Sequence, residues 1–262
     1  LVGYLLVLPR ALSADPRLGV AFLALLDGLG VVLTYCWLRR CAGERLALLA
    51  AALYAANPWA VFFARKTWAE ILPVLTVLIL WAACEVILRR RPVWALAFFP
   101  LLALQVQAHV MGALFLPAVL LTLLLFWPRW KNRYTLYGIG LGLLILLPYG
   151  VVLARQWTAT REVLQQGAAG GAVGDLQALS YALWFTSGAT ITALLGRSAP
   201  LLRGWEQALR AVNWVTAALI AYALGLIAWA GLRRRRLDGL PALLLIWLVG
   251  PLLPLIFARS AQ

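Results

Sequence analysis

The chain has 262 residues, of which 64% are apolar and only 12% are charged, and its formal net charge is +14. Soluble domains carry about 25% charged residues, so this composition excludes a soluble globular protein. It also overrides the nucleic-acid partner that so basic a chain would otherwise suggest. We expect a protein that crosses a bilayer many times and keeps its basic residues in the loops.

The apolar stretches predict where the chain crosses the membrane, because a spanning helix needs about 20 apolar residues. In chain order, the candidate crossings are 18–38, 46–63, 70–88, 93–108, 110–127, 135–154, 212–232 and 239–258. The apolar run 92–127 is too long for one crossing, so it must fold back between Gln105 and Gly112. The predicted fold is an all-α transmembrane bundle of about eight crossings.

The basic residues predict the orientation of this bundle. Four short turns carry most of them: Arg39, Arg40 and Arg45; Arg89, Arg90 and Arg91; Arg129, Lys131 and Arg133; and Arg233, Arg234, Arg235 and Arg236. The positive-inside rule places these turns in the cytoplasm. Turns 89–91 and 129–133 can share a side only if the chain crosses twice between them, which again requires a reversal near His109.

The number of crossings also assigns the long segment 155–211 to the outside, because one more crossing within it would place the turn with Arg233–Arg236 outside. Its apolar part, 176–195, is predicted to be an interfacial helix capped by Asp175, and its first part, 165–174, a flexible hinge. The chain is therefore divided into a transmembrane core (1–154), this external segment, and a C-terminal transmembrane hairpin (212–262).

Two adjacent cations, Arg65 and Lys66, lie at the predicted outer end of a crossing, followed by Glu70 and flanked by Trp59 and Trp68. One interpretation is an aromatic belt with snorkelling cations and a Lys66–Glu70 pair at i, i+4 spacing. The other is an anion site, in which arginine offers a bidentate fork to a phosphate and lysine a point charge. The residues alone leave both open.

His109, the only histidine, follows Gln105 and Gln107 at the predicted reversal. A lone histidine on a helix is most often a satisfied polar group. Irregular backbone below the membrane surface survives only inside protein or along a wet cavity, so the three side chains could instead line a cavity and hydrogen-bond a sugar or phosphate.

The remaining acids have simpler interpretations. Asp27, near the middle of a crossing, is either functional or a protonated group that is hydrogen-bonded to a neighbouring helix. Glu85 is expected to form a surface ion pair with Arg89, and Asp15 to cap the helix that begins at Pro16.

The sequence offers no other recognisable chemical motif. The three cysteines, Cys36, Cys41 and Cys84, have no paired spacing, and no HExxH, GxSxG or CxxC motif occurs. We therefore predict no metal site, no cofactor and no disulfide framework. The alternating Gly138, Gly140 and Gly142 are expected to allow close helix packing.

The order of these pieces resembles the polytopic C-type (GT-C) membrane glycosyltransferases, most closely bacterial relatives of protein mannosyltransferases and of lipid A aminoarabinose transferases. The resemblance extends from about Tyr4 to Ile256. It is carried by the run Tyr4 to Pro9, the crossing closed by Leu38-Arg39-Arg40, the crossing from Gly43 to Asn57-Pro58, the exit Phe62-Phe63-Ala64-Arg65-Lys66, and His109 before a Leu/Pro helix.

The resemblance implies a multi-pass enzyme of the bacterial plasma membrane. It would transfer a sugar from a polyprenyl-phosphate carrier to a lipid, glycan or protein acceptor on the outer face. Arg65 and Lys66 match the position where this family places basic residues, and would bind the donor phosphate; Glu70 and His109 would line the cavity with Gln105 and Gln107.

The family's catalytic carboxylate lies in a loop upstream of the segment matched by Tyr4 to Pro9, and Asp15 does not match it. We therefore expect a fragment whose catalytic carboxylate lies upstream of Leu1. Two other functions remain open at this point: a membrane transporter or flippase, although no internal repeat is visible, and a non-catalytic membrane subunit.

Overall fold

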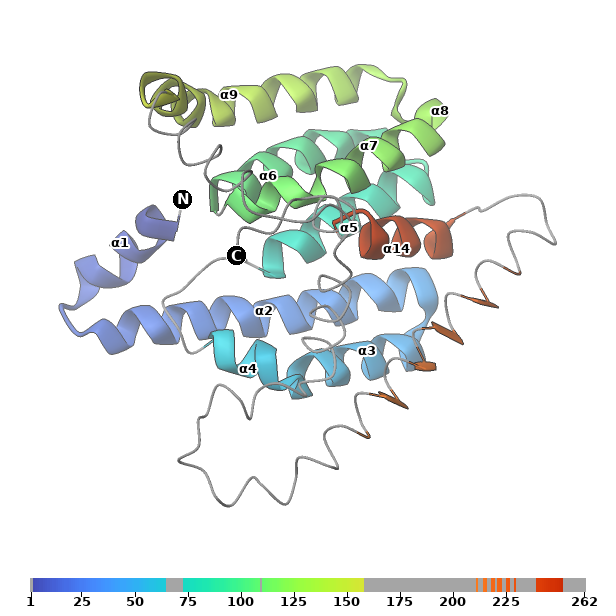
Figure 1. Cartoon of the computed structure of the whole chain (residues 1–262), viewed down its shortest axis with the longest axis horizontal. Coiled ribbons are helices and arrows are strands. Elements are labelled where there is room, and N and C mark those ends of the chain that lie inside the picture. Colours follow the sequence, from blue (N-terminus) through green and yellow to red (C-terminus); the bar gives the residue numbers. More distant parts are fainter. Residues whose placement is uncertain are drawn as a thin grey trace, which may run out of the picture.

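The computed structural model describes residues 2–64, 73–108, 110–157 and 239–251, with isolated helical positions between 211 and 229. These residues form helices and no strand, so the predicted all-α fold is confirmed (Figure 1). In chain order the elements are α1 (Val2–Leu12), α2 (Pro16–Ala42), α3 (Glu44–Ala56), α4 (Pro58–Ala64), α5 (Pro73–Ile87), η1 (Pro92–Trp94), α6 (Ala95–Ala108), η2 (Val110–Phe115), α7 (Leu116–Leu125), α8 (Trp127–Trp130), α9 (Arg133–Arg155) and α14 (Leu240–Val249).

Most of the described helices coincide with predicted crossings. Helix α2 contains 18–38, α5 matches 70–88, α6 matches 93–108, α9 matches 135–154 and α14 lies within 239–258. The interfacial helix at 176–195, the hinge at 165–174 and nearly all of 155–211 and 212–232 fall outside the described residues.

The predicted crossing 46–63 is two helices, α3 and α4, that meet at Asn57. The backbone N–H of Asn57 donates to the carbonyl oxygen of Tyr54, and its side-chain oxygen accepts from the N–H of Ala60 at 3.2 Å. Pro58 occupies the first position of α4. A residue before proline is disfavoured in helical conformation, which explains the break.

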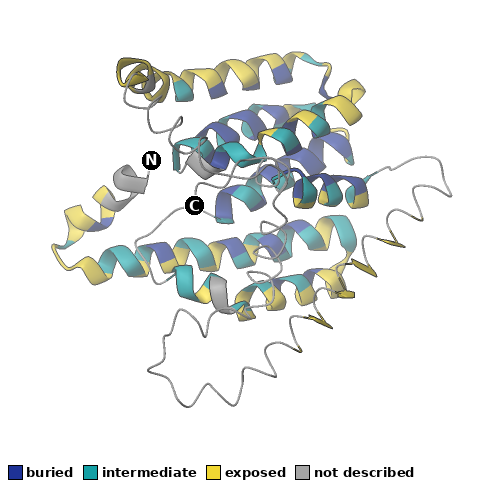
Figure 2. Cartoon of the chain, viewed as in Figure 1, coloured by how far each residue is buried: buried dark blue, intermediate teal, exposed yellow. Residues whose placement is uncertain are grey.

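Among the described residues, two helices are long and apolar enough to cross a membrane: α2 and the Arg133–Val152 part of α9. Only 17% of each spanning window is buried, whereas the core helix of a soluble protein is mostly buried. Large apolar side chains such as Leu143, Leu144 and Leu147 are exposed on α9, and Figure 2 shows exposed residues along the outer helices. Soluble proteins rarely expose such extensive apolar surface, so the pattern indicates an integral membrane protein.

The predicted reversal between α6 and α7 is confirmed by contacts at both ends of the pair. At one end, a Cβ placed on Gly112 would lie 2.5 Å from the carbonyl oxygen of Gln105. At the other end, the ring centroid of Trp130 is 4.8 Å from that of Phe98 and 5.9 Å from that of Phe99. The chain therefore runs back along α6 after Ala108.

The main core lies between α5, α6, α7 and α14, with α9 on one side and α2 and α3 on the other (Figure 1). Its fully buried large side chains include Ile79, Phe98 and Trp130. Helix α14 belongs to this core, because the indole N–H of Trp247 donates to the Thr122 hydroxyl at 3.1 Å.

Two of the three alternating glycines of α9 provide the close packing predicted for them. A Cβ on Gly138 would overlap the carbonyl oxygen of Ala95, and one on Gly142 would lie 3.0 Å from the carbonyl oxygen of Phe99. Gly140 has open space around it, so the prediction was wrong there. Residues four apart share a helix face, whereas the residue between them points elsewhere.

Three arginine-rich turns share one end of the bundle, as predicted. The Glu85 carboxylate lies within ion-pair distance of Arg40 from the first turn and of Arg89 and Arg91 from the second. Trp130, in the third turn, belongs to the same buried cluster as Val86 and Ile87. We call this the arginine end. The run 233–236 lies outside the described residues, and Gly239, shortly after it, lies against Leu88.

Candidate functional site

The end of the bundle opposite the arginine end contains Gln105 and Gln107, the two predicted site residues that the structure describes. Leu23, Val74 and Leu75 form a small buried cluster there, and Ala108 packs against it. The first turn of α5 and the last residue of α6 therefore meet. We call this the glutamine end, after Gln105 and Gln107 near the end of α6.

Four of the predicted site residues, Arg65, Lys66, Glu70 and His109, lie outside the described residues. Their described chain neighbours are Ala64 and Pro73 on either side of the first three, and Ala108 and Val110 on either side of His109. Of these neighbours, Ala108 packs against the buried cluster that contains Val74 and Leu75, in the first turn of α5.

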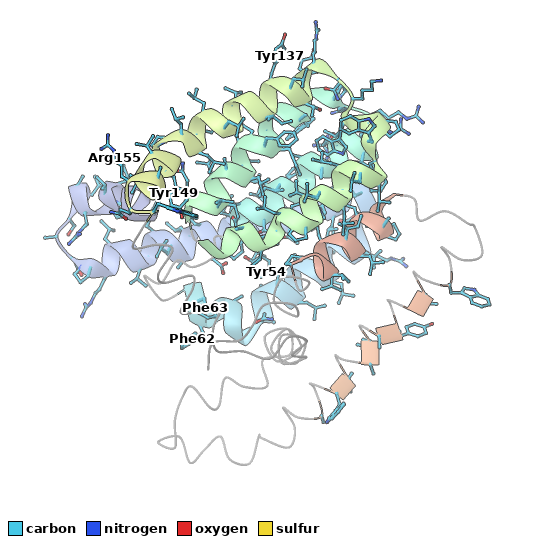
Figure 3. The ribbon with its side chains drawn as sticks, turned by 45° about the horizontal axis from the view of Figure 1, so that its top comes forward. Tyr54, Phe62, Phe63, Tyr137, Tyr149 and Arg155 are labelled. Carbon is cyan, nitrogen blue, oxygen red and sulfur yellow. The ribbon has the colours of Figure 1, made fainter. Side chains whose placement is uncertain are left out.

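Aromatic side chains precede the predicted cations. Phe62 and Phe63 lie on the last turn of α4, with ring centroids 5.5 Å apart in an edge-to-face arrangement (Figure 3). Both side chains are partly exposed. This arrangement agrees with an aromatic belt at the membrane surface, and it is compatible with an anion site next to it.

Gln105 is the most deeply buried of the predicted site residues that the structure describes. Its exposed fraction is 2%, and its side-chain oxygen has no hydrogen-bond partner among the described residues. An unsatisfied buried amide oxygen is costly, typically about 1–3 kcal/mol. Such an atom is a candidate acceptor for a hydroxyl of a bound ligand.

Gln107 faces a different neighbour. Its amide N–H donates to the carbonyl oxygen of Ile145 on α9. Pro148, inside α9, lacks an N–H and interrupts the helical hydrogen bonding beside this carbonyl. Gln107 therefore joins α6 to α9, whereas Gln105 is buried in the bundle. The two amides have different surroundings among the described residues.

A partly buried polar pair, of which the sequence analysis identified only Asp27, lies beside this end. The hydroxyl of Tyr54 on α3 donates to Oδ1 of Asp27 on α2 at 2.8 Å. A Cβ on Gly30 would lie 3.0 Å from that hydroxyl and 3.5 Å from the backbone nitrogen of Val74. A hydrogen bond between Asp27 and a neighbouring helix, one of the two interpretations of this residue, is present with Asp27 as the acceptor, and Tyr54 is the partner that the prediction lacked.

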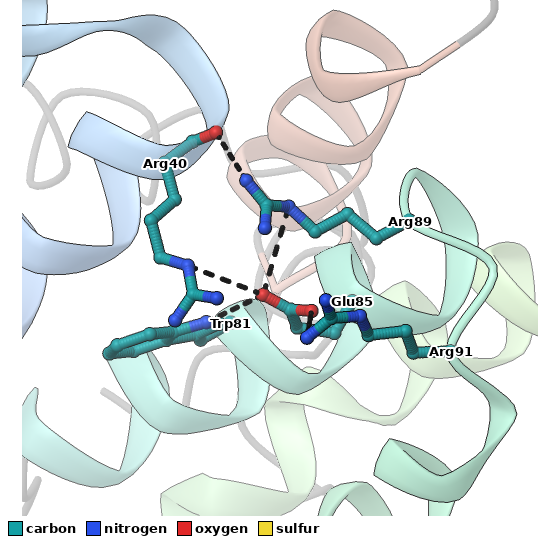
Figure 4. Close-up of polar contacts among 5 residues, drawn as sticks. All are labelled: Arg40, Trp81, Glu85, Arg89 and Arg91. Carbon is teal, nitrogen blue, oxygen red and sulfur yellow. Dashed lines mark hydrogen bonds and ion pairs between the residues drawn. The ribbon is translucent and has the colours of Figure 1, made fainter.

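Glu85, at the arginine end, is not the surface residue that was predicted. Its side chain is 0% exposed, and the predicted pair with Arg89 is one of three ion pairs, at N–O distances of 3.8 Å to Arg40, 3.8 Å to Arg89 and 3.6 Å to Arg91 (Figure 4). The indole N–H of Trp81 donates to its Oε1 at 3.2 Å. The i, i+4 spacing to Arg89 was correct, but α2 and the turn after α5 enclose the carboxylate.

The predicted helix cap at Asp15 is confirmed: its Oδ1 accepts from the backbone N–H of Arg17 at 2.8 Å, and Pro16 is the first residue of α2. Asp15 therefore has a structural role. Within the described residues, no group of three or more His, Cys, Asp or Glu side chains could hold a metal ion.

The comparison with protein families decides what this bundle is. Residues 1–151 match the family model of dolichyl-phosphate-mannose-protein mannosyltransferase. The chain belongs to this family of GT-C membrane glycosyltransferases. No curated protein and no solved structure shows significant similarity to the chain.

Family membership confirms the resemblance inferred from sequence and supports glycosyltransferase activity over the transporter alternative. The matched region contains every predicted site residue from Arg65 to His109 and extends through most of α9. It also contains Asp27, Tyr54 and the Glu85 cluster.

Proposed function

We propose that this glycosyltransferase takes its sugar from a polyprenyl-phosphate carrier and transfers it to a lipid, glycan or protein acceptor on the outer face of the bacterial plasma membrane. The observation that supports the proposal is the meeting of the first turn of α5 with Ala108 of α6 at the glutamine end, because α5 follows the segment with Arg65 and Lys66 in the sequence and His109 follows Ala108. The name of the matched family supports the donor class, because it specifies a sugar on a lipid phosphate.

In the proposed reaction, the departing lipid phosphate gains negative charge as its bond to the sugar breaks. Arg65 and Lys66 stabilise that charge, arginine through two parallel N–H bonds and lysine as a point charge. Donors fixed in place before the reaction are usually the largest electrostatic contribution to such a step. Glu70 and His109 line the cavity beside them, and the unpaired oxygen of Gln105 accepts a hydrogen bond from the sugar.

The proposed orientation follows from the arginine end. Three turns rich in arginine gather there, and the positive-inside rule assigns such turns to the cytoplasm. The glutamine end then faces outward, where polyprenyl-linked sugars meet their acceptors. Residues 155–211, with the interfacial helix at 176–195, complete the outer face in this proposal, and 212–262 forms the C-terminal hairpin.

The experiment compares Arg65→Ala and Lys66→Ala in the full-length gene product, assayed in membranes with an undecaprenyl-phosphate sugar. Removing one donor from a developing oxyanion lowers kcat by about 100-fold, and we expect that loss for Arg65→Ala. A smaller loss is expected for Lys66→Ala, because a flexible ammonium makes fewer directed bonds.

Arg17→Ala is the matched control. Arg17 is an exposed cation in the first turn of α2, and only its backbone N–H takes part in the cap, so the variant keeps the cap and loses one charge. It should retain full activity. Unchanged activity of Arg65→Ala would show that Arg65 does not bind the donor phosphate. An equal loss of activity in Arg17→Ala would show that the effect comes from the loss of any surface cation.

A further inference from the structure

The cluster around Glu85 has more positive charge than the carboxylate can balance. Among the described residues, three guanidinium groups surround one carboxylate, which leaves two positive charges without an anion in this part of the cluster. Arg39 and Arg90, next to two of these arginines in the chain, are exposed cations at the same end. Like charges repel one another more strongly near a low-dielectric bilayer than in water, so a bound anion would stabilise this cluster.

The guanidinium groups also keep most of their hydrogen-bonding capacity. Their ion pairs with Glu85 are 3.6–3.8 Å long, whereas a charge-assisted N–H···O bond is typically about 2.7–2.9 Å. Each guanidinium has five N–H donors. In the part of the chain that the structure describes, the only direct hydrogen bond from them within the cluster runs from Arg89 to the carbonyl oxygen of Arg40, at 2.9 Å.

The arginines are nevertheless held in position. Arg40 lies over the Trp81 ring at 5.6 Å, and Trp81 stacks on Trp94 with the planes 10° apart. Glu85 is fully buried beneath them, whereas the side chains of Arg40, Arg89 and Arg91 are 43%, 32% and 55% exposed. Glu85 and Trp81 thus orient the guanidinium groups, as the contacts in Figure 4 show, while the three arginine side chains stay partly exposed.

The depth of the cluster identifies the class of anion. It lies where α2 and α5 end, at the boundary between apolar helices and the arginine-rich turns, and its tryptophans are typical of the headgroup region. The most abundant anions at that depth are phosphates of acidic phospholipids, and basic pockets between transmembrane helices bind such headgroups.

We propose that Arg40, Arg89 and Arg91 form a binding site for the headgroup phosphate of an anionic phospholipid, with Glu85 as the residue that positions them. The site lies at the end of the bundle opposite the proposed sugar-transfer site. Its lipid is a bound structural partner, and it is neither donor nor acceptor in the reaction.

The test measures lipid binding to the purified full chain by native mass spectrometry in neutral detergent. Phosphatidylglycerol and phosphatidylcholine are titrated separately against the wild type, Arg40→Gln, Arg91→Gln and Arg45→Gln. Arg45→Gln is the matched control, because Arg45 is an exposed cation in the first turn of α3, close to Arg40 in the sequence, and makes no ion pair with Glu85 among the described residues. All three variants lose one positive charge.

We expect the wild type to retain phosphatidylglycerol in preference to phosphatidylcholine. Each cluster variant should bind phosphatidylglycerol about fivefold more weakly, and Arg45→Gln should match the wild type. Equal losses in all three variants, or no preference for phosphatidylglycerol, would overturn the proposal. If inorganic phosphate at the same concentration displaces the lipid, the site binds a free anion as well as a lipid headgroup, and the proposal of a lipid site is wrong.

Thermal unfolding of each variant in phosphatidylcholine checks the fold. Arg91 is the most exposed of the three arginines, so Arg91→Gln should unfold at the wild-type temperature even if Arg40→Gln does not. Wild-type phosphatidylglycerol binding by a folded Arg91→Gln protein contradicts the proposal independently of Arg40.

Discussion

The two ends of the helix bundle are held together by different means. Toward the arginine end, large side chains such as Phe98 and Trp130 are fully buried, and a buried carboxylate joins two turns. At the glutamine end, the buried cluster consists of Leu23, Val74 and Leu75, and helices are joined by hydrogen bonds from Tyr54 and Gln107.

This difference separates stability from chemistry along the bundle. Regions that bind ligands or change shape are generally drawn from the less densely packed parts of a protein. The proposed sugar-transfer site lies at the end where the described residues form the smaller buried cluster, whereas the larger cluster anchors the helices toward the other end. Mutations at the arginine end should therefore affect unfolding more than activity, and mutations at the glutamine end should do the reverse.

The largest effect on stability is expected for Gly138→Ala, near the arginine end. The new methyl group would overlap the backbone carbonyl of Ala95, which cannot rotate away as a side chain could. Helices α6 and α9 would have to separate, at a cost of about 3 kcal/mol in the free energy of unfolding. Denaturant unfolding in mixed micelles, followed by circular dichroism, measures this loss.

Gly140→Ala is the matched control for the same helix. Its methyl group would enter open space, and alanine favours helix over glycine by up to about 1 kcal/mol, so stability should stay equal or increase. Equal losses in the two variants would show that α9 does not pack on α6 through Gly138.

The next largest effect is expected for Glu85→Gln. The amide keeps the shape of the side chain and can still accept from Trp81, but it leaves three arginines without their shared anion. Losing one partner of a fully buried pair costs about 3–5 kcal/mol, and the partial exposure of these arginines reduces our expectation to about 2 kcal/mol.

Glu44→Gln removes an exposed carboxylate from the first turn of α3, and should cost only about 0.5 kcal/mol through the helix dipole. The same unfolding assay compares both variants. If they lose stability equally, the Glu85 cluster contributes no more than an ordinary surface charge, and the contrast between the two ends weakens.

The sequence predicted the helices and their reversal well, because these follow from the lengths of apolar runs and from the spacing of arginine turns. The fold-back after Gln105 is an example: a run too long for one crossing must turn, and Gly112 is the small residue that contacts Gln105. The break at Asn57-Pro58 was also visible as a motif, but its effect on the predicted crossing was missed.

Tertiary contacts were predictable only in part. The pairing of Glu85 with Arg89 follows from i, i+4 spacing, whereas its burial depends on Arg40 and Arg91, which only the packing of α2 against α5 brings near. Similarly, a carboxylate in a crossing predicts a partner for Asp27, but the identity of Tyr54 depends on how α2 and α3 pair across the turn at Gly43.

After Gly138→Ala and Glu85→Gln, the third effect, about 1 kcal/mol, is expected for Tyr54→Phe at the glutamine end, since it removes the only donor that the described residues offer to Oδ1 of Asp27. Tyr137→Phe, on the exposed side of α9, should leave unfolding unchanged. If Tyr54→Phe also lowers sugar transfer while Tyr137→Phe does not, the hydrogen bond between Tyr54 and Asp27 contributes to the proposed sugar-transfer site at the glutamine end. A stability loss as large as that of Gly138→Ala would instead show that the glutamine end is anchored as firmly as the arginine end.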